Sequence, residues 1–333
     1  MRAAIVGCGL IAQVHVKALQ ELRDITLVAA ADIRQDRALT FAKQYHCKAY
    51  LSLEEMLEEE QIDVLHICTP HVFHVPMIQY ALSKGVHVFS EKPPAISPQQ
   101  YKTLTSLHTD RHLGFCFQNR YNSCVQIARK LLSDGTAGKV LGARAFVTWS
   151  RDAAYYTESG WRGKLATEGG GVLINQSIHT MDLLVYLIGT PTAVDARMSN
   201  HHLQGIIEVE DTMEACIHFD DKIAIFYATT AYCENSAPLI ELSCENMTIR
   251  IEDPRITCIY RDGHTETPPT DAGCISGKGY WGSGHLSCIT DFYQSIRENR
   301  PFAQDLEGIR DTAQLMLATY ESARAEVERK LLC

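Results

Sequence analysis

The first third of the chain alternates short apolar runs with helical patterns. The apolar runs are continuous, as in strands whose two faces are both covered, and they lie at 3–6, 26–31, 62–68, 86–89 and 113–117. Helical patterns separate or follow them, at 10–22, 34–45, 53–60, 74–84 and 97–109. Because strands that alternate with helices pair in parallel, this order predicts an α/β fold, with a parallel sheet covered by helices on both faces.

The pattern changes after about residue 118. A helix at 122–134, a strand at 140–149 and a long apolar helix at about 172–188 come first. Strand-like segments follow closely, near 192–200, 209–219, 222–233, 237–244, 247–252 and 255–260. Two helices close the chain, at about 285–298 and 306–330. Consecutive strands with short turns predict a mostly antiparallel sheet, so we expect one domain over 1–118 and a second α/β domain over 119–333.

Composition narrows the class of partner. The 333 residues are 46% hydrophobic, enough to fill the cores of two domains. Lys and Arg number 31 against 40 Asp and Glu, and the net charge of −9 argues against nucleic acid as the main partner. No stretch reaches the roughly 18 uninterrupted apolar residues of a membrane span. We therefore expect a small-molecule partner and no membrane.

Cysteine usage points to a reducing compartment. The 12 cysteines are scattered, several of them inside apolar runs, and the sequence holds no Cys-x-x-Cys pair. This pattern is typical of reduced thiols that serve as small core residues. We therefore expect a cytoplasmic protein with neither a disulfide framework nor a metal site.

A glycine motif follows the first strand and opens the first helix. Its residues are Gly7, Cys8, Gly9, Leu10, Ile11 and Ala12. In this context Gly7 permits a tight turn, Gly9 admits a pyrophosphate close to the backbone, and Ala12 allows close packing of helix on strand. The helix N-terminus then offers free N–H groups to the phosphates. The motif predicts dinucleotide binding in the first domain.

Asp32, at the end of the second strand, indicates which of NAD and NADP the protein prefers. Its carboxylate is placed to accept hydrogen bonds from the ribose hydroxyls and repels a 2′-phosphate, which favours NAD. Arg34 and Arg37 lie close enough in sequence to blur this preference, so NADP stays open.

Glu91, Lys92 and Pro93 stand at the end of the apolar run 86–90. Open α/β sheets bind ligands in the crevice outside the carboxyl ends of their strands, so Lys92 is a site candidate by position. A surface lysine before a turn is the alternative interpretation.

A second constellation lies in the C-terminal half. Three consecutive glycines, 169–171, precede a helix on which Asn175, His179 and Asp182 are spaced for one face. Consecutive glycines lose much conformational entropy on folding. They are therefore expected where the backbone must come close to another group. The polar stripe either lines a site or forms a satisfied internal network.

Together these motifs resemble the glucose-fructose oxidoreductase/inositol dehydrogenase/MocA family of nicotinamide-dependent sugar oxidoreductases. The resemblance covers nearly the whole chain and rests on several separated segments. They are the Gly7–Ala12 motif, Thr69-Pro70-His71 with His74, residues 85–93, the glycine triplet with His179, and closing segments around Asp291-Phe292, Arg300-Pro301-Phe302, Glu307-Gly308 and 321–324.

The resemblance implies a Rossmann domain followed by an α/β domain with a large, mostly antiparallel sheet that forms a homodimer or homotetramer contact. It implies Lys92 and His179 as the catalytic pair, with Thr69, Pro70, His71, His74, Glu91 and Lys92 near the cofactor. The implied substrate is a sugar, glycoside or cyclitol. Relatives usually carry aspartate where this chain has Asn175, and often asparagine where it has His71. An amide cannot take a proton, so Asn175 can only orient a group.

Further pocket candidates come from loops and from the domain junction. Arg120 and Tyr121 resemble a family segment near the substrate. The loop 151–168 carries Tyr156, Trp161 and Arg162, and the loop 262–284 carries Tyr280 and Trp281 just before His285. Long loops in compact domains are often binding elements, although ordinary surface cover remains the alternative for each residue.

Two functions from different classes follow. The first is an enzyme in which His179, with an unperturbed pKa of about 6.5, takes the proton of a secondary alcohol while Lys92 stabilises the developing alkoxide. The second is a non-catalytic NAD(P)-binding regulator of the same fold. Lys92 and His179 favour the enzyme, and the missing acid at Asn175 keeps the regulator open.

Overall fold

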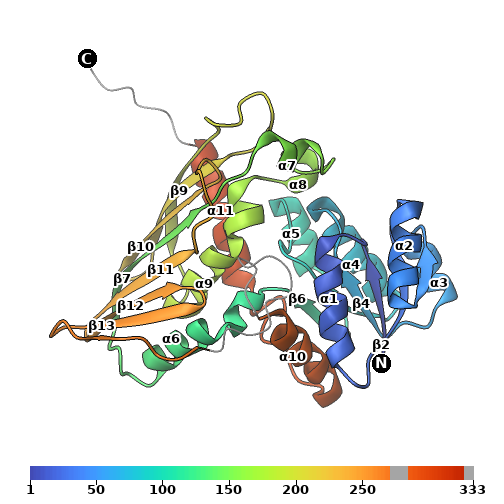
Figure 1. Ribbon diagram of the computed structural model, residues 1–333, viewed down its shortest axis with the longest axis horizontal. Coiled ribbons are helices and arrows are strands. Elements are labelled where there is room, and N and C mark those ends of the chain that lie inside the picture. The colour runs from blue at the N-terminus through green and yellow to red at the C-terminus, as the bar shows by residue number, and fades with distance from the viewer. Residues whose placement is uncertain (271–283, 326–333) are drawn as a thin grey trace. The chain divides into compact units, whose positions relative to one another are not determined.

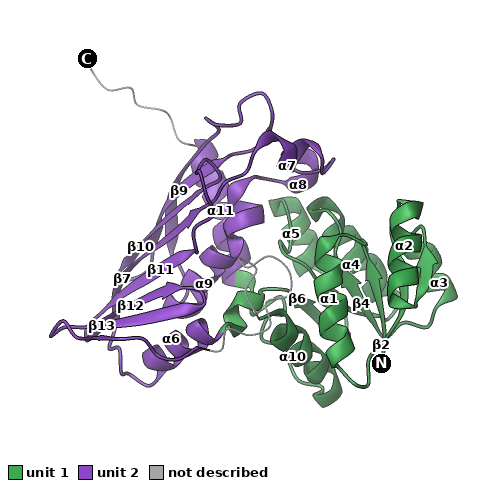
Figure 2. Ribbon diagram, in the orientation of Figure 1, with its two compact units in different colours: residues 1–122, 272–310 green, residues 123–271, 311–333 purple. Residues whose placement is uncertain are grey.

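The computed structural model describes residues 1–270 and 284–325, so Tyr280 and Trp281 lie outside the described residues. The chain divides into two compact units (Figure 2). One contains residues 1–122 and 272–310, and the other contains residues 123–271 and 311–333. The first boundary, at 122/123, lies four residues beyond the expected 118/119. The first unit also includes a second stretch of chain, because helix α10 (His285–Glu298) packs with it although α10 follows most of the second unit in sequence.

The first unit is built on a parallel sheet of six strands in the order β3-β2-β1-β4-β5-β6. The strands are β1 (Arg2–Val6), β2 (Thr26–Ala31), β3 (Lys48–Tyr50), β4 (Val64–Ile67), β5 (His87–Ser90) and β6 (Leu113–Phe115). The expected parallel sheet is confirmed. The sequence analysis missed β3, whose three residues are too short for an apolar run to stand out.

Helices connect these strands. They are α1 (Leu10–Glu21), α2 (Gln35–Tyr45), α3 (Leu53–Glu59), η1 (His71–Phe73), α4 (His74–Ser83), α5 (Pro98–Thr105) and η2 (Gln118–Tyr121), with α10 added from the C-terminal part. Local sequence explains two of the helix starts. The Ser52 hydroxyl accepts a hydrogen bond from the Glu55 N–H at the start of α3, and Ser97 does the same for Gln100 ahead of α5.

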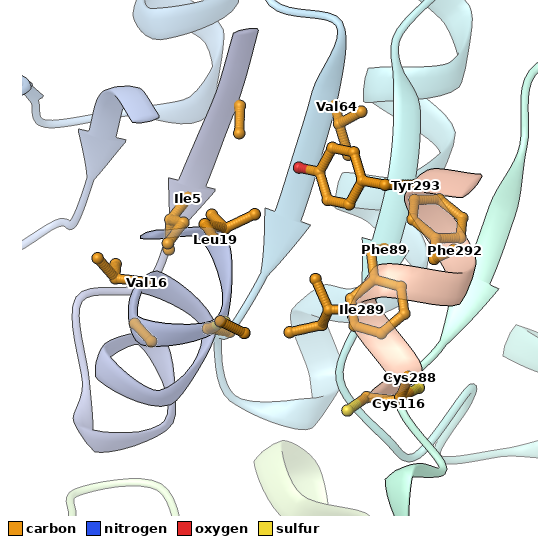
Figure 3. Close-up of a cluster of buried hydrophobic side chains, with 14 of the residues drawn as sticks. Ile5, Val16, Leu19, Val64, Phe89, Cys116, Cys288, Ile289, Phe292 and Tyr293 are labelled. Carbon is orange, nitrogen blue, oxygen red and sulfur yellow. The ribbon is translucent and has the colours of Figure 1, made fainter. Parts of the chain in front are cut away.

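Helix α10 completes the core of this unit. Ile289, Phe292 and Tyr293 belong to the same buried cluster as Phe89 of β5 (Figure 3). Gly114 on β6 makes room for this packing, since a Cβ there would lie 2.6 Å from the Phe292 ring. A segment distant in sequence thus supplies side chains that the Rossmann sheet needs.

The second unit is built on an eight-stranded sheet in the order β14-β13-β12-β11-β7-β10-β9-β8. The strands are β7 (Val140–Thr148), β8 (Ala193–Ser199), β9 (Thr212–His218), β10 (Ile223–Thr229), β11 (Leu239–Cys244), β12 (Met247–Glu252), β13 (Arg255–Tyr260) and β14 (Thr265–Glu266). All neighbours are antiparallel except β7 and β10, which run parallel. The expected mostly antiparallel sheet is confirmed.

The helices of this unit include α6, α9 and α11, which lie on one side of the sheet (Figure 1). Among the described residues its helices are α6 (Ser123–Ser133), α7 (Ala153–Thr157), α8 (Leu165–Glu168), η3 (Val172–Ser177), α9 (Ile178–Ile188) and α11 (Arg310–Ala325). The predicted single helix at 172–188 is a π-helix, η3, continued by α9.

In the described part of the chain, one helical stretch, Leu165–Ile188, is long and apolar enough to cross a membrane. Its 18-residue apolar window is 78% buried inside the protein, as in a core helix.

Candidate functional site

The glycine loop between β1 and α1 has the geometry that the motif predicts. Gly7 has a φ of 90°, and a Cβ at this position would lie 2.5 Å from the carbonyl oxygen of Cys68. Only glycine therefore lets the chain turn here while the ends of β1 and β4 stay close. The Cys68 N–H in turn donates to the carbonyl of Val6 at 2.8 Å.

The rest of the loop leaves space for a ligand. Beyond Gly9 itself and its immediate neighbours in the chain, no atom of the described residues lies within 4 Å of a Cβ placed on Gly9, and Leu10 beside it is 64% exposed. Ile11 is half-buried, and Ala12 is fully buried where α1 packs on the sheet. An open glycine at the amino end of a helix is the surface that a pyrophosphate needs. The loop therefore fits a dinucleotide.

Asp32 ties the glycine loop to the end of β2. Its carboxylate accepts hydrogen bonds from the backbone N–H groups of Cys8 and Arg34, both at 2.9 Å. The Arg34 guanidinium pairs with Asp36 at 3.0 Å on the exposed surface, and Arg37 is also exposed. Burial and the nearby Asp32 charge raise the pKa of the Cys8 thiol to about 12, so it stays neutral. The Asp32 carboxylate, held between the glycine loop and the end of β2, lies where a cofactor ribose is expected.

His74 joins the segments that follow β4 and β5. The buried ring lies 2.9 Å from the carbonyl oxygen of Pro93 through Nδ1 and 2.9 Å from that of Thr69 through Nε2. Burial lowers the pKa of His74. His71 is also buried, with its ring 5.7 Å from the His74 ring. Pro70 is half-buried and directly precedes His71, the first residue of η1.

A chain of buried polar groups runs under the end of β5. His15 Nε2 lies 3.0 Å from Glu91 Oε1, His15 Nδ1 lies 2.9 Å from His66 Nδ1, and His66 Nε2 lies 2.9 Å from the Tyr293 hydroxyl. The sequence analysis did not single out His15 or His66. The available signal was a histidine between two valines on helix α1 and another inside the apolar strand β4.

The charges in this chain are set by opposing effects. Burial lowers the pKa of His15, but hydrogen bonds to Cys116 and Glu91 outweigh it and raise the pKa to about 9. Burial alone would raise the pKa of Glu91, yet the His15 hydrogen bond and nearby positive charge bring it well below its usual range. The two therefore form a buried ion pair. This pair anchors the residue that immediately precedes the half-buried Lys92.

The same buried region holds two further groups. His285, at the start of α10, has its ring 6.5 Å from the His15 ring, and burial lowers its pKa to about 4. The ligand atoms of His15, Glu91 and Cys116 lie within 4.8 Å of one another, a spacing that would suit a metal ion. The sequence pattern contained no sign of this grouping, because its members come from three separate elements.

Arg120 and Tyr121 make contacts within the first unit. Arg120 is buried and donates from Nη1 to the carbonyl of Gly308 at 3.1 Å. The Tyr121 hydroxyl donates to Asp291 at 2.6 Å. Both side chains thus hold the C-terminal segment onto this unit, and their proposed role towards a substrate stays a prediction.

In the second unit, the three polar residues predicted to form a stripe on the long helix differ in their burial. Asn175 on η3 and His179 on α9 are half-buried. Asp182 is 1% exposed and accepts a hydrogen bond from the Thr312 hydroxyl of α11 at 2.7 Å. Asp182 therefore belongs to an internal network. For this residue the internal-network interpretation applies, whereas His179, three positions earlier on the same α-helix, is half-buried.

The glycine triplet has a packing reason. A Cβ on Gly170 would lie 2.1 Å from the Tyr320 hydroxyl, and one on Gly171 would lie 1.9 Å from the carbonyl oxygen of Glu210. The Glu210 carboxylate accepts hydrogen bonds from the N–H groups of Gly171 and Leu173 and from the Tyr320 hydroxyl, at 2.8, 3.1 and 2.8 Å. It thus caps the amino end of η3 from inside the protein.

Glu168 contacts Asn175 directly and was not singled out from the sequence. It is fully buried, and its carboxylate accepts hydrogen bonds from the Asn175 side-chain amide and from the Gly163 N–H. Burial raises the pKa of Glu168 to about 7. The available signal was an acidic residue directly before the glycine triplet.

The loop residues predicted near the pocket have different surroundings. Tyr156 is 3% exposed and packs with Leu203, Ile207 and Val209, and burial raises the pKa of its hydroxyl. Trp161 is half-buried. The Arg162 guanidinium lies over the rings of Tyr155 and Trp161, at 4.5 and 5.1 Å from their centres. Tyr156 is thus a core residue of this unit, while Arg162 and Trp161 form a cation–π pair.

Comparison with known proteins connects these features to a family. Residues 1–116 match the model of an oxidoreductase family with an NAD-binding Rossmann fold, and residues 125–250 match the GFO/IDH/MocA C-terminal domain. The chain is 30% identical to D-glucoside 3-dehydrogenase of Escherichia coli strain K12, over 97% of this chain and 95% of that one. The protein belongs to the Gfo/Idh/MocA family.

Other members of the family agree with this assignment. Inositol 2-dehydrogenase of Rhizobium meliloti is 28% identical over 59% of this chain and 58% of its own. The structure of the WlbA dehydrogenase from Bordetella pertussis, in complex with NADH and UDP-GlcNAcA, superposes with a TM-score of 0.86 at 25% identity. That match covers 98% of this chain and 97% of the other. The protein is thus an NAD-binding oxidoreductase with the two-part fold of its family.

Proposed function

We propose that this protein transfers hydride between NAD and a secondary alcohol or ketone of a sugar, glycoside or cyclitol. The observation that carries the proposal is the open Gly9 loop with Asp32 held beside it, which fits a dinucleotide. The near full-length similarity to a D-glucoside 3-dehydrogenase makes a D-glucoside the first substrate to test, with carbon 3 as the oxidised position.

The proposed cofactor is NAD rather than NADP. A 2′-phosphate on the ribose would bring negative charge towards the Asp32 carboxylate, which already accepts two backbone N–H groups and is thereby fixed in place. The Arg34 guanidinium is paired with Asp36, which reduces its capacity to compensate for that charge.

Roles for the polar residues follow from their chemistry. NAD supplies a hydride acceptor at its nicotinamide ring when bound. We propose that His179 is the base that removes the proton of the substrate hydroxyl, because an imidazole titrates near neutral pH. We assign to Lys92 the stabilisation of the developing alkoxide by its positive charge. Asn175 orients a hydroxyl by hydrogen bonding, since an amide cannot accept a proton. In reduction the same groups act in reverse.

Turnover of a substrate panel tests the reaction. We expect the purified protein, given NAD, to form NADH with at least one member of a panel of D-glucosides, free hexoses and inositols, read by absorbance of the reduced nicotinamide. NADP at equal concentration should give a lower rate. Tight NAD binding with no turnover of any panel member would instead support a non-catalytic NAD-binding regulator.

The open face of the second unit's sheet supports an oligomer. On β10, Ile223 and Ile225 are 47% and 43% exposed, while the intervening Ala224 is buried. Half-buried Tyr227 and Phe146 continue this face, with ring centres 6.4 Å apart. The same face carries Arg144, which lies beside Ile225 and pairs with Glu241 at 2.8 Å, and exposed apolar residues mixed with charged ones are typical of a subunit contact. We propose a homodimer or homotetramer formed through it, in the cytoplasm, where the free thiols of the described cysteines stay reduced.

A charge placed on this face should weaken the assembly. We expect Ile225→Glu to shift the sedimenting mass towards the monomer, because the new carboxylate would be desolvated at the contact. Ile206→Glu is the matched control, since Ile206 is 45% exposed but lies outside the sheet. An unchanged mass for Ile225→Glu, or a monomeric parent protein, would refute this contact.

A further inference from the structure

We propose that Glu168 is a positioning residue that sets which side of the Asn175 amide is presented to the substrate. The proposal rests on the proposed function, since it assigns a role within the same substrate site. Glu168 and Asn175 then act as a pair: Glu168 gains or loses the proton, and Asn175 makes the hydrogen bond to the substrate.

The geometry of the pair is well defined within the second unit. Glu168 ends α8 and is fully buried, and Asn175 lies on η3 seven positions later. Oε1 of Glu168 accepts the hydrogen bond from Asn175 Nδ2, and Oε2 accepts one from the Gly163 N–H at 2.5 Å. Asn175 is only half-buried. The hydrogen bond therefore links the fully buried Glu168 carboxylate to an amide that a small molecule can reach.

This contact controls what Asn175 offers. An ionised carboxylate only accepts hydrogen bonds, so it holds the NH₂ side of the amide towards itself and orients Oδ1, which can accept a hydrogen bond from a substrate hydroxyl, the other way. A protonated carboxyl can donate to Oδ1 instead, which allows the amide to turn and present its NH₂ side. Protonation of Glu168 thus changes the group that Asn175 presents to the substrate from a hydrogen-bond acceptor to a donor.

The surroundings of Glu168 bring its titration into the working pH range. Burial raises its pKa, the hydrogen bonds from Gly163 and Asn175 lower it, and the result is about 7. Among charged neighbours, the Glu210 carboxylate raises this pKa and the Arg162 guanidinium lowers it. The hydroxyls of Tyr156 and Tyr320 also face this carboxylate, and both have raised pKa values and stay neutral.

Exchange of the two side chains tests the pair. We expect Glu168→Gln to lower kcat/KM by about ten- to a hundredfold, since a hydrogen bond to a charged group is lost. Asn175→Asp alone should also impair the enzyme, because it sets two carboxyl groups against each other. The double variant Glu168→Gln/Asn175→Asp restores one acid and one amide, and we expect it to recover at least about tenfold over Asn175→Asp.

The pH profile separates positioning from a structural role. Besides the titration of the proposed histidine base, the parent enzyme should show a second component in the pH dependence of kcat/KM near pH 7, and Glu168→Gln should lack this component because glutamine does not titrate. The matched control is Glu208→Gln, which alters an exposed carboxylate that accepts the Leu165 N–H at the start of α8 and should leave the profile unchanged. A parent-like pH profile in Glu168→Gln, or a double variant no better than Asn175→Asp, overturns the proposal.

A second measurement needs no substrate and keeps this proposal distinct from the proposed function. A carboxyl with a pKa raised from 4.5 to about 7 favours folding when protonated, so its contribution to stability falls as the pH rises from about 4.5 to about 7. Glu168→Gln should lack this part of the pH dependence of Tm. If the substrate panel is silent, a parent-like pH dependence still overturns the assignment to Glu168, and its loss supports it.

Discussion

Lys92→Met should lower kcat by at least about a thousandfold while leaving NAD affinity nearly unchanged. Loss of a charge that stabilises a developing oxyanion typically costs about 10²–10³ in rate, and the lost orientation of the hydroxyl adds to this. Lys92 follows directly on Glu91, whose carboxylate is held in the buried ion pair with His15. The backbone at Lys92 is thus fixed, and the substitution removes the charge while methionine keeps an apolar stem.

His179→Ala should show the same separation of turnover from binding. His179, on α9, is assigned to the substrate hydroxyl and is not part of the glycine loop proposed to bind the dinucleotide, so we expect NAD affinity to change little. We expect a fall of about 10²–10⁴ in kcat, as for loss of a general base.

Both variants are read by NADH fluorescence titration for binding and by initial rates for turnover. Lys102→Met is the matched control, because Lys102 is an exposed lysine on α5 of the same unit. Full turnover in either Lys92→Met or His179→Ala would reject the catalytic assignment. A loss of NAD binding that parallels the loss of rate would point to damage in the cofactor site.

Gly171→Ala should strongly destabilise the second unit. The added Cβ would lie 1.9 Å from the carbonyl oxygen of Glu210, a backbone atom that cannot rotate away. The Val172 N–H also donates to that carbonyl at 3.1 Å, so moving the chain breaks a hydrogen bond at the start of η3. We expect a loss of more than about 3 kcal/mol in the free energy of unfolding, measured by thermal and urea denaturation.

Gly9→Ala is the counterpart that separates packing from ligand access. Its Cβ would meet no described atom within 4 Å outside the adjoining residues of the loop, so the fold should remain as stable as the parent to within about 1 kcal/mol. The methyl group would occupy the space that a pyrophosphate approaches, and we expect NAD affinity to fall by at least about tenfold. A stable Gly171→Ala, or unchanged NAD affinity in Gly9→Ala, would contradict these explanations.

The parts of the fold that follow from local pattern were predictable. Continuous apolar runs separated by helices indicated the parallel sheet, and close-spaced strands indicated the second, mostly antiparallel one. The glycine motif was recognised because each glycine has a separate backbone reason at a fixed spacing. Short elements such as β3 escaped, since three residues carry no period.

The sequence by itself determined the Rossmann sheet, the dinucleotide motif and the family, because these depend on spacing along one stretch of chain. Only the tertiary structure decided the placement of α10 in the first unit, the His15–Glu91 ion pair and the contact of Glu168 with Asn175. It also assigned Asp182 to an internal network with α11. These features depend on burial and on partners that the chain brings together only when folded. Pairing and desolvation, which set the charge of a buried acid or histidine, cannot be read from the residue's neighbours in sequence.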